Sequence, residues 1–524
     1  MKPLGAQISH MLKDRDVDVI FGIPGVHNQE MYRGIEEAGI THVLARHEQG
    51  AGFMADGYAR ATGKPGIAYV ITGPGLCNAM TAMGQAYSDS VSVLVLSSCL
   101  DEVAARRGQL HQMLDQVGAG ACVCDWSEQA NTADAAFQLV DRAFAEFSTK
   151  RKRSKHIQVP IAQLQALAGP APKPQSVQIA TIATDDQLTD IAAQLNAAEK
   201  PLFIFGGGAV GASTVARDLV AKTQAAVMMS YAGRGVIAPD YPLSFGSFLA
   251  RPSSADITRQ ADLVVVVGCE LAEVDIWRYD LGNKAPMIRI DIDVECLTDD
   301  QSNETVICAD ADAVLKGLLP LVHRKTSDWT ADQVTSTRAR WRAEVEAERP
   351  GIISVVDALK EVISDDTMIY SDMTQFAYVA KEVWDMPRPG HWHHPSGFGT
   401  LGYAMPAAIG GAMGRPGLQT MAIAGDYGFQ YSIQELGAAV ELNLSLPIIL
   451  WDNGKLKEIE DSMRGAQIAP NAVIARNPDF VKLAQAYDIH ATAPKTLGAM
   501  QDDVIAAFTR SGPTLIHVTS GILS

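Results

Sequence analysis

The stretch that decides the fold is Met-Ala-Ile-Ala-Gly-Asp-Tyr-Gly at residues 421–428, followed by Ile-Ile-Leu-Trp-Asp-Asn-Gly at residues 448–454. Each begins with apolar residues that are typical of a buried strand and ends in a polar turn. A helical pattern at 434–441 separates them, which predicts two parallel strands joined by a helical crossover. Asp426 and Asn453 would then both lie at the carboxyl ends of strands, where open α/β sheets bind ligands.

The rest of the chain repeats this alternation of strands and helices. We expect an α/β fold with three doubly wound parallel-sheet domains, at residues 1–165, 186–322 and 351–524. A proline-rich run at 169–174 and a charged stretch at 323–350 are interpreted as linkers. The other expected strands are 19–21, 42–45, 67–71, 91–97, 157–159, 202–205, 263–267, 287–292, 368–370 and 515–518.

Composition narrows the class of protein. Of 524 residues, 47% are apolar and 20% charged, which is typical of a globular protein. The formal charge of −17 disfavours nucleic acid as a partner. The sequence shows no long apolar run and no signal-peptide pattern at Met1, which predicts no membrane span and a cytoplasmic protein. Its seven cysteines are scattered, and we expect them to be reduced.

The Asp426 and Asn453 pair predicts a metal site. A carboxylate and an amide oxygen, with a nearby backbone carbonyl, are the hard donors that Mg²⁺ prefers, and a diphosphate is the expected co-ligand. The alternative is two unrelated turns, because Asp after Gly and Asn before Gly are common turn residues. The pair is more specific than either residue alone.

A second stretch with a chemical signal is His-Glu-Gln-Gly-Ala-Gly-Phe-Met-Ala-Asp-Gly-Tyr-Ala-Arg, residues 47–60. A strand is expected to end near His47 and a helix to begin near Gln49, which places Glu48 at the junction. The alternative is that Glu48 only complements the helix dipole. A third stretch, residues 396–408, is rich in glycine and would let a backbone approach a ligand.

Together these motifs resemble those of thiamine-diphosphate enzymes in the acetolactate synthase and 2-oxo acid decarboxylase family. By this resemblance Asp426 and Asn453 are side-chain ligands of Mg²⁺, and the Lys455 carbonyl is a backbone ligand. Two positions depart from the family pattern, because Tyr427 replaces a glycine and Asp452 replaces an asparagine. The resemblance further implies that the diphosphate end of the cofactor is lined by Gly425, Tyr427 and Leu456.

The same resemblance assigns the pyrimidine end of the cofactor. Glu48 would hydrogen-bond the aminopyrimidine ring, Gly399 would offer it a backbone carbonyl, and Leu401 would be the apolar wedge that bends the cofactor. The two ends would bind domains of different subunits, which implies a homodimer or homotetramer with active sites at the interfaces. Other residues expected on the pyrimidine and substrate side are Pro24, Gly25, Val26, His27, Gly73, Asn78, Leu110, His111 and Gln112. Glu48, His111 and Gln112 are the expected catalytic residues.

The middle domain carries Gly-Gly-Gly-Ala-Val-Gly at 206–211 after an expected strand, which satisfies a dinucleotide-binding pattern. The acidic residue expected about 20 positions further on is missing, so NAD is disfavoured. The resembling family has such a domain, which holds FAD in one branch. Residues 242–247 differ from that branch, so FAD is possible but not favoured.

Within the family, the N-terminal region most resembles 5-guanidino-2-oxopentanoate decarboxylases. Glu458 and Asp461 are three residues apart on an expected helix and could receive a guanidinium group. The alternative is a solvated helix face. We therefore expect decarboxylation of 5-guanidino-2-oxopentanoate to 4-guanidinobutanal and CO2. The alternatives are an acetolactate synthase-like carboligase, a diverged relative with another substrate, or a non-catalytic regulator, which the retained Glu48 disfavours.

Overall fold

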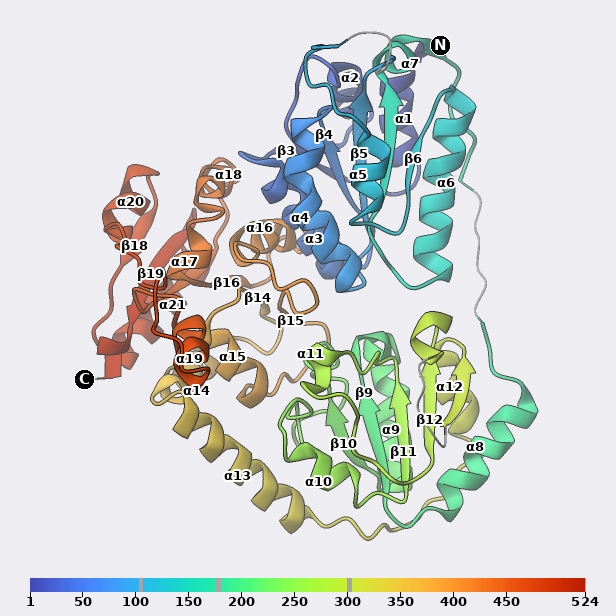
Figure 1. Cartoon of the computed structure of the whole chain (residues 1–524), viewed down its shortest axis with the longest axis vertical. Coiled ribbons are helices and arrows are strands. Elements are labelled where there is room, and N and C mark those ends of the chain that lie inside the picture. Colours follow the sequence, from blue (N-terminus) through green and yellow to red (C-terminus); the bar gives the residue numbers. More distant parts are fainter. Residues whose placement is uncertain (103–106, 175–180, 299–303, 524) are drawn as a thin grey trace. The chain divides into compact units, whose positions relative to one another are not determined.

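Figure 1 shows the computed structural model, which describes residues 1–102, 107–174, 181–298 and 304–523. Three larger sheets form among these residues, each built from parallel strands and flanked by helices. The expected α/β class is therefore confirmed. The chain divides into two compact units, one of residues 1–178, 368–374 and 394–524, the other of residues 179–367 and 375–393. The three domain boundaries stay a prediction.

The N-terminal sheet has the strand order β3-β2-β4-β5-β7-β6, and its neighbouring strands run parallel. Because β3 lies on one side of β2 and β4 on the other, the loops after β2 and β4 diverge at a switch point, where such sheets bind ligands. The strands are β2 (Val19–Gly22), β3 (Thr41–Leu44), β4 (Gly66–Val70), β5 (Val93–Cys99), β6 (Ser127–Gln129) and β7 (Lys155–Pro160).

Alternating side chains bury both faces of this sheet. Ile20 packs with apolar residues of α1 (Leu4–Lys13), α2 (Gln29–Glu37) and α6 (Ala133–Thr149). These helices are labelled in Figure 1. Val19 and Phe21 point to the other face, against α3 (Glu48–Thr62) and α4 (Pro74–Ser88). The short elements of this part are β1 (Lys2–Pro3), α5 (Gln116–Ala121), α7 (Ile161–Gln165) and β8 (Leu167–Ala168), and β1 pairs antiparallel with β8.

The C-terminal part of the same unit repeats this topology. Its strands follow the order β14-β16-β17-β19-β18 and run parallel, matching β2-β4-β5-β7-β6. The strands are β14 (Met368–Ser371), β16 (Thr420–Gly425), β17 (Pro447–Asp452), β18 (His490–Thr492) and β19 (Thr514–Thr519). The helices are α16 (Ala404–Gly414), α17 (Asp426–Phe429), η3 (Ile433–Glu435), α18 (Leu436–Glu441), α19 (Lys457–Gly465), α20 (Phe480–Ala486), α21 (Leu497–Thr509) and η4 (Ser520–Leu523).

Helices α3 and α16 approach unusually closely. A Cβ on Gly57 would lie 1.9 Å from the Ala407 carbonyl oxygen, and one on Gly410 would lie 1.8 Å from that of Met54. The Tyr370 hydroxyl donates to the Gly57 carbonyl at 2.7 Å. Glycine at both positions therefore lets the two backbones touch and joins the N-terminal and C-terminal parts of the first unit.

The second unit contains the central sheet, with the order β10-β9-β11-β12-β13. Apolar residues of α8, α9 and α12 cover it. Its strands are β9 (Pro201–Phe205), β10 (Ala226–Met229), β11 (Leu263–Val267), β12 (Met287–Asp291) and β13 (Glu304–Cys308). The other elements of this unit are α8 (Asp185–Ala197), η1 (Gly207–Ala212), α9 (Ser213–Thr223), α10 (Ser254–Thr258), α11 (Glu273–Ile276), η2 (Val294–Leu297), α12 (Ala311–Leu318), α13 (Ala331–Glu348), α14 (Ile352–Val362), α15 (Gln375–Val383) and β15 (Trp392–His393).

Main-chain contacts account for two glycines of the 206–211 loop, Gly206 and Gly208. The Gly208 amide donates to the Gly268 carbonyl at 2.9 Å, and a Cβ on Gly206 would lie 2.1 Å from the same oxygen. These glycines therefore let two βα turns of the central sheet pack together. This packing explains glycine at two of the three positions of the pattern.

The expected strands and linker regions lie close to those observed, with differences at the sheet edges. Strands β6, β13 and β18 are among those that were not expected from the sequence. Their residues are polar or partly exposed, so they lack the apolar run that marks the central strands. The charged stretch at 323–350, interpreted as a linker, contains the helix α13 (Ala331–Glu348).

A search of the described residues finds no helix both long and apolar enough to span a membrane.

Candidate active site

Glu48 begins α3 just after strand β3. The His47 side chain caps the helix by accepting from the Gln49 amide. Glu48 is only 8% exposed, and Asn78 Nδ2 donates to its Oε2 at 2.9 Å. A Cβ on Gly75 would lie 3.4 Å from Glu48 Oε1. Glu48 is thus a buried carboxyl with one oxygen held by Asn78, and glycine at position 75 leaves room beside the other.

A second buried carboxyl supports the segment before Glu48. Glu435 is fully buried and accepts the backbone amides of Arg46 and His47, with Oε1 2.9 Å from the His47 nitrogen. Burial raises the pKa of Glu435 to about 7, against the lowering effect of these amides. The sequence did not single out this residue, because Glu435 reads as part of an ordinary helical pattern.

The loop after β4 is held by Gln116, which the sequence also did not single out. Gln116 Oε1 accepts from the Gly73 amide at 2.9 Å, and its Nε2 donates to the Ser98 carbonyl at 2.8 Å. Gly73 has φ +70°, and a Cβ there would lie 2.4 Å from the His111 carbonyl oxygen. The expected cofactor residue Gly73 and the loop that carries His111 are therefore in direct contact.

The structure also brings together His27 and His111. Their rings meet edge to face, with centroids 4.9 Å apart. Burial, and then the neighbouring His111, lower the pKa of His27, so its neutral form is favoured. This pair lies beside the loop after β2, in which the Gly25 amide donates to Asn28 at 2.8 Å.

The other residues expected on the pyrimidine and substrate side lie on the loop after β2 and on the loop that carries His111. Val26 is 63% exposed and Leu110 is 62% exposed, and Pro24 is also exposed. Gln112 Oε1 accepts from the Gly108 amide at 2.9 Å, so its side chain supports the loop on which it lies.

The glycine-rich loop before α16 is fixed on both sides of Leu401. The Thr400 hydroxyl donates to Gln85 Oε1 at 3.0 Å, and the Gly402 amide donates to Asp372 Oδ2 at 2.9 Å. Burial raises the pKa of Asp372 to about 6, although backbone amides oppose this. Gly399 has φ +67°, which explains glycine at that position. Leu401 is half-buried between these two anchors.

Asp426 and Asp452 form the centre of the second cluster. Gly425 pairs with Trp451 across β16 and β17, so this register places the two aspartates side by side. Asp426 is 3% exposed. Burial raises its pKa, as does the charge of Asp452, while a hydrogen bond from Asn477 opposes the shift. The predicted position of Asp426 and Asn453 after neighbouring parallel strands agrees with the structure.

The other expected ligands lie in the loop that follows. Asn453 Oδ1 accepts from the Lys455 amide at 3.1 Å, which shapes the turn after β17. The Leu456 amide donates to the Val473 carbonyl at 2.8 Å. The Lys455 side chain forms an ion pair with Glu460 at 3.0 Å. The predicted metal ligand is the backbone carbonyl of Lys455, which this ion pair does not involve.

Tyr427 stands where the resembling family has glycine. It lies in the first turn of α17, and its ring is 6.0 Å from that of Tyr431, tilted by 53°. The glycine after it, Gly428, faces Asp372, since a Cβ there would lie 2.9 Å from Asp372 Oδ2. The bulk of Tyr427 is thus accommodated beside a second tyrosine.

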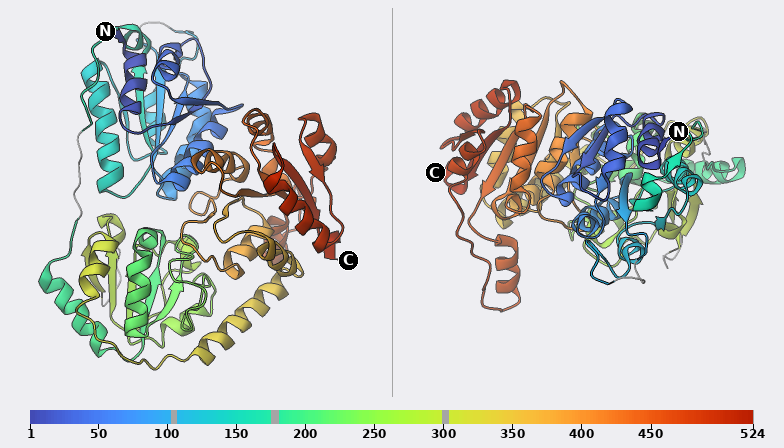
Figure 2. Two further views of the ribbon diagram at one scale, coloured as in Figure 1. Left: turned by 180° about the vertical axis from the view of Figure 1, so that it is seen from behind. Right: turned by 90° about the horizontal axis from the view of Figure 1, so that it is seen from above.

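Helix α19 carries both expected substrate residues. It lies at the tip of an excursion of residues 453–478 from the C-terminal sheet, visible in the right view of Figure 2. Asp461 is exposed and forms an ion pair with Lys457, while Glu458 is half-buried. The third carboxylate, Glu460, is buried, and hydrogen bonds from Arg464 and Lys455 lower its pKa to about 2.

The residues that the sequence predicts for the two ends of the cofactor lie in two clusters, and their assignment to the cofactor stays a prediction. The first, around Glu48, gathers at the carboxyl edge of the N-terminal sheet, and the second, around Asp426, at that of the C-terminal sheet. No three histidine, cysteine or acidic side chains gather into a metal site in the part of the chain that the structure describes. A cation at Asp426 would therefore need amide, carbonyl and diphosphate oxygens as further ligands, which suits Mg²⁺.

Comparison with known proteins identifies the family of the chain. Three models of thiamine pyrophosphate enzymes match the chain: the N-terminal TPP-binding domain at residues 3–119, the central domain at 188–318 and the C-terminal TPP-binding domain at 372–518. The chain therefore belongs to the thiamine pyrophosphate enzyme family.

Among individual proteins, the chain is similar to the probable 2-ketoarginine decarboxylase AruI of Pseudomonas aeruginosa, with 38% identity over 98% of this chain and 93% of the relative. It is also similar to the large subunit of acetolactate synthase isozyme 1 of Escherichia coli, with 28% identity over 98% and 92% of the two chains. The acetolactate synthase large subunit of Lactococcus lactis is 28% identical over 97% and 90%.

Proposed function

We propose that this chain catalyses the thiamine-diphosphate- and Mg²⁺-dependent, non-oxidative decarboxylation of 5-guanidino-2-oxopentanoate to 4-guanidinobutanal and CO2. The observation that carries this proposal is the 38% identity, over nearly the whole chain, to a protein named as a probable decarboxylase of 2-ketoarginine, which is the same 2-oxo acid. The buried Glu48 and the Asp426 cluster support a cofactor-dependent reaction.

The first cluster would bind the pyrimidine end of the cofactor. When bound, thiamine diphosphate supplies the electron sink for the pair of electrons left behind as CO2 departs. Glu48 would hold a proton at the pyrimidine ring, oriented by its hydrogen bond from Asn78. Gly399 and Leu401 would contact the ring from the anchored loop before α16. Pro24, Gly25 and Gly73 would line the surrounding turns.

The second cluster would hold the diphosphate end. Asp426, Asn453 and the Lys455 carbonyl would coordinate Mg²⁺, with Gly425, Tyr427 and Leu456 beside the diphosphate. The donors fit this ion, because they are hard oxygens at or just after the ends of adjacent strands. Asp426 is also buried, and no cationic side chain is among its described hydrogen-bond partners. FAD stays possible but not favoured, because residues 242–247 differ from the branch that holds it.

The substrate would contact two groups of residues, one at its 2-oxo acid end and one at its guanidinium end. Val26, His27, Leu110, His111 and Gln112 would contact the 2-oxo acid end. Glu458 and Asp461 would receive the guanidinium group. Lys457 pairs with Asp461, but exposed ion pairs are weak, so a guanidinium can replace it.

The active sites would lie at interfaces of a homodimer or homotetramer, in the cytoplasm. The excursion that carries α19 exposes three isoleucines, Ile459 at 48%, Ile468 at 53% and Ile474 at 77%. Exposed apolar residues on one protruding segment are typical of a surface that another subunit covers.

A carboligase of the acetolactate synthase kind is the second candidate function, favoured by the relatives at 28% identity. The carboxylates of α19 support the decarboxylase, because Glu458 and Asp461 could receive a guanidinium group. The decisive experiment compares kcat/KM for CO2 release from 5-guanidino-2-oxopentanoate with that from pyruvate.

We expect preference for the guanidino acid, and a loss of about tenfold or more in that preference for Asp461→Asn or Glu458→Gln. The matched control is Asp479→Asn, an exposed aspartate outside α19, which should keep the preference. Faster condensation of two pyruvate molecules than release of an aldehyde would contradict the decarboxylase proposal.

A further inference from the structure

One neutral side chain lies between the two aspartates of the second cluster. Asn477 Nδ2 donates to Asp426 Oδ2 at 2.6 Å and to Asp452 Oδ1 at 2.9 Å. Its own Oδ1 accepts from Gln430 Nε2 at 3.3 Å, which settles the orientation of the amide. Both amide hydrogens of Asn477 are thus directed at carboxylates.

The chain delivers Asn477 to this place from both sides. Before it, the residues that return from α19 pair antiparallel with the residues that leave β17, through the bridge of Lys455 with Ile474 and the bond from the Ala475 amide to the Gly454 carbonyl. After it, Phe480 begins α20 and packs edge to face on Phe429 at 6.0 Å and His517 at 5.7 Å. Asn477 is therefore fixed at the base of the excursion.

The electrostatics explain why a donor is needed there. The register of β16 and β17 forces Asp426 and Asp452 together, and two close carboxylates repel each other. His517 contacts the other oxygen of Asp452, Oδ2, at 2.8 Å. The Asn477 side chain contacts both aspartates, and it donates without adding charge.

The same contact orients Asp426. Asn477 holds the Oδ2 atom of Asp426, and the backbone amide of Asn453 also hydrogen-bonds the Asp426 carboxylate. Carboxylates that bind metals are commonly oriented by such a hydrogen bond to a second residue.

We propose that Asn477 is a positioning residue for the cofactor site: its amide orients Asp426 toward the cation and offsets the repulsion between Asp426 and Asp452. The inference rests on the proposed function, because it requires Mg²⁺ at Asp426. It adds a residue outside the expected set of ligands.

The first test measures Mg²⁺ affinity. Calorimetric titration of MgCl2 into protein with saturating thiamine diphosphate should give a dissociation constant about 10–100-fold higher for Asn477→Ala than for wild type. Asn471→Ala, an exposed asparagine on the same excursion, is the matched control and should stay within about twofold. Unchanged affinity in Asn477→Ala would overturn the inference alone. Failure of the wild type to bind Mg²⁺ with thiamine diphosphate would overturn the proposed function, and the inference with it.

The second test uses the protein without metal or cofactor, in EDTA. Asn477→Asp keeps the shape but removes the donor and adds a third carboxylate, so Tm should fall by about 3 °C or more. Adding Asp452→Asn restores both the charge and one amide donor, and should recover at least half of this fall. A purely steric role would leave Tm nearly unchanged in the first variant. No rescue in the double variant would contradict the charge-offset role.

Discussion

At the scale of single residues, the chemistry depends on carboxyl groups held in defined places. Glu48 is buried and takes one hydrogen bond from Asn78. Glu435 supports the backbone just before it, by accepting the amides of Arg46 and His47. The position of Glu48 is therefore determined by contacts from two parts of the chain that are far apart in sequence.

The first prediction concerns Glu48. Glu48→Gln should lower kcat by at least about a hundredfold, because the amide cannot exchange a proton with the cofactor ring. Steady-state CO2 release measures this. Gln49→Ala is the control, since the capping contact of that residue is made by its backbone. Near-normal turnover in Glu48→Gln would mean that the assigned role is wrong.

Sequence patterns identified the site residues that follow strands, but not the residues that support them. The positions of Glu48, Asp426 and Asn453 at strand ends followed from apolar runs that end in polar turns. Asn477, Glu435 and Gln116 could not be found in this way, because each acts through a tertiary contact with a segment distant in sequence. Asn477 precedes Pro478 and reads as an ordinary turn residue.

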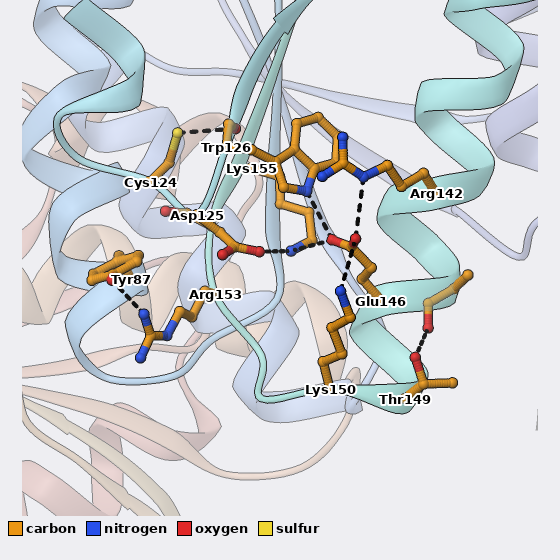
Figure 3. Close-up of polar contacts among 12 residues, drawn as sticks. Tyr87, Cys124, Asp125, Trp126, Arg142, Glu146, Thr149, Lys150, Arg153 and Lys155 are labelled. Atoms are coloured by element: carbon orange, nitrogen blue, oxygen red, sulfur yellow. Dashed lines mark hydrogen bonds and ion pairs between the residues drawn. The ribbon is translucent and has the colours of Figure 1, made fainter. Parts of the chain in front are cut away.

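At the scale of elements, helix packing and a buried ion cluster hold the sheets in shape. The glycine contact of α3 with α16 lets the helix that begins at Glu48 pack on the C-terminal part of the same unit. A second feature lies in the N-terminal sheet, where Lys155 of β7 is 1% exposed and contacts Asp125 at 2.5 Å and Glu146 at 3.1 Å (Figure 3).

The glycine contact yields the second prediction. Gly57→Ala or Gly410→Ala would place a methyl group against backbone, so each should lower the free energy of unfolding by about 1–3 kcal/mol, or more where the helices cannot shift. Thermal unfolding measures the loss. Gly498→Ala, in helix α21 with nothing within 4 Å of the added Cβ, should be neutral or slightly stabilising. Equal stability of all three variants would contradict the close packing.

The third prediction concerns pH. Burial would raise the pKa of Glu146, but hydrogen bonds from Trp126, Lys155 and Arg142 outweigh it and lower the pKa to about 2. A lowered carboxyl pKa stabilises the fold above the unfolded value, about 4.3, and this contribution is lost as pH falls toward 2. Glu146→Gln should therefore be less stable than wild type at pH 7, and the difference should narrow between pH 4.3 and 2.

Urea unfolding at several pH values tests this. At pH 7 we expect a loss of about 3 kcal/mol, because the variant leaves Lys155 with one carboxylate fewer in a buried site. Glu128→Gln on β6, whose contact with Arg142 is 3.5 Å long and exposed, is the control and should change little. A difference that does not vary with pH would contradict the assigned cause.

At the scale of the whole molecule, the N-terminal and C-terminal sheets repeat one topology. The N-terminal and C-terminal sheets share a strand order, and each presents a cluster at its carboxyl edge. The α/β class and the central strands could be predicted, because buried parallel strands are continuous apolar runs. The polar edge strands β6 and β18 could not, since their pairing depends on a neighbour already in place.

The central claim is that this chain is a cofactor-dependent decarboxylase of 5-guanidino-2-oxopentanoate. The most direct measurement is CO2 and aldehyde release from that acid, by protein dialysed against EDTA, before and after thiamine diphosphate and Mg²⁺ are added. The account predicts no turnover after dialysis, and full recovery with both additions, with one 4-guanidinobutanal formed for each CO2. Turnover that does not depend on the two additions, or no turnover of this acid when both are present, would contradict it.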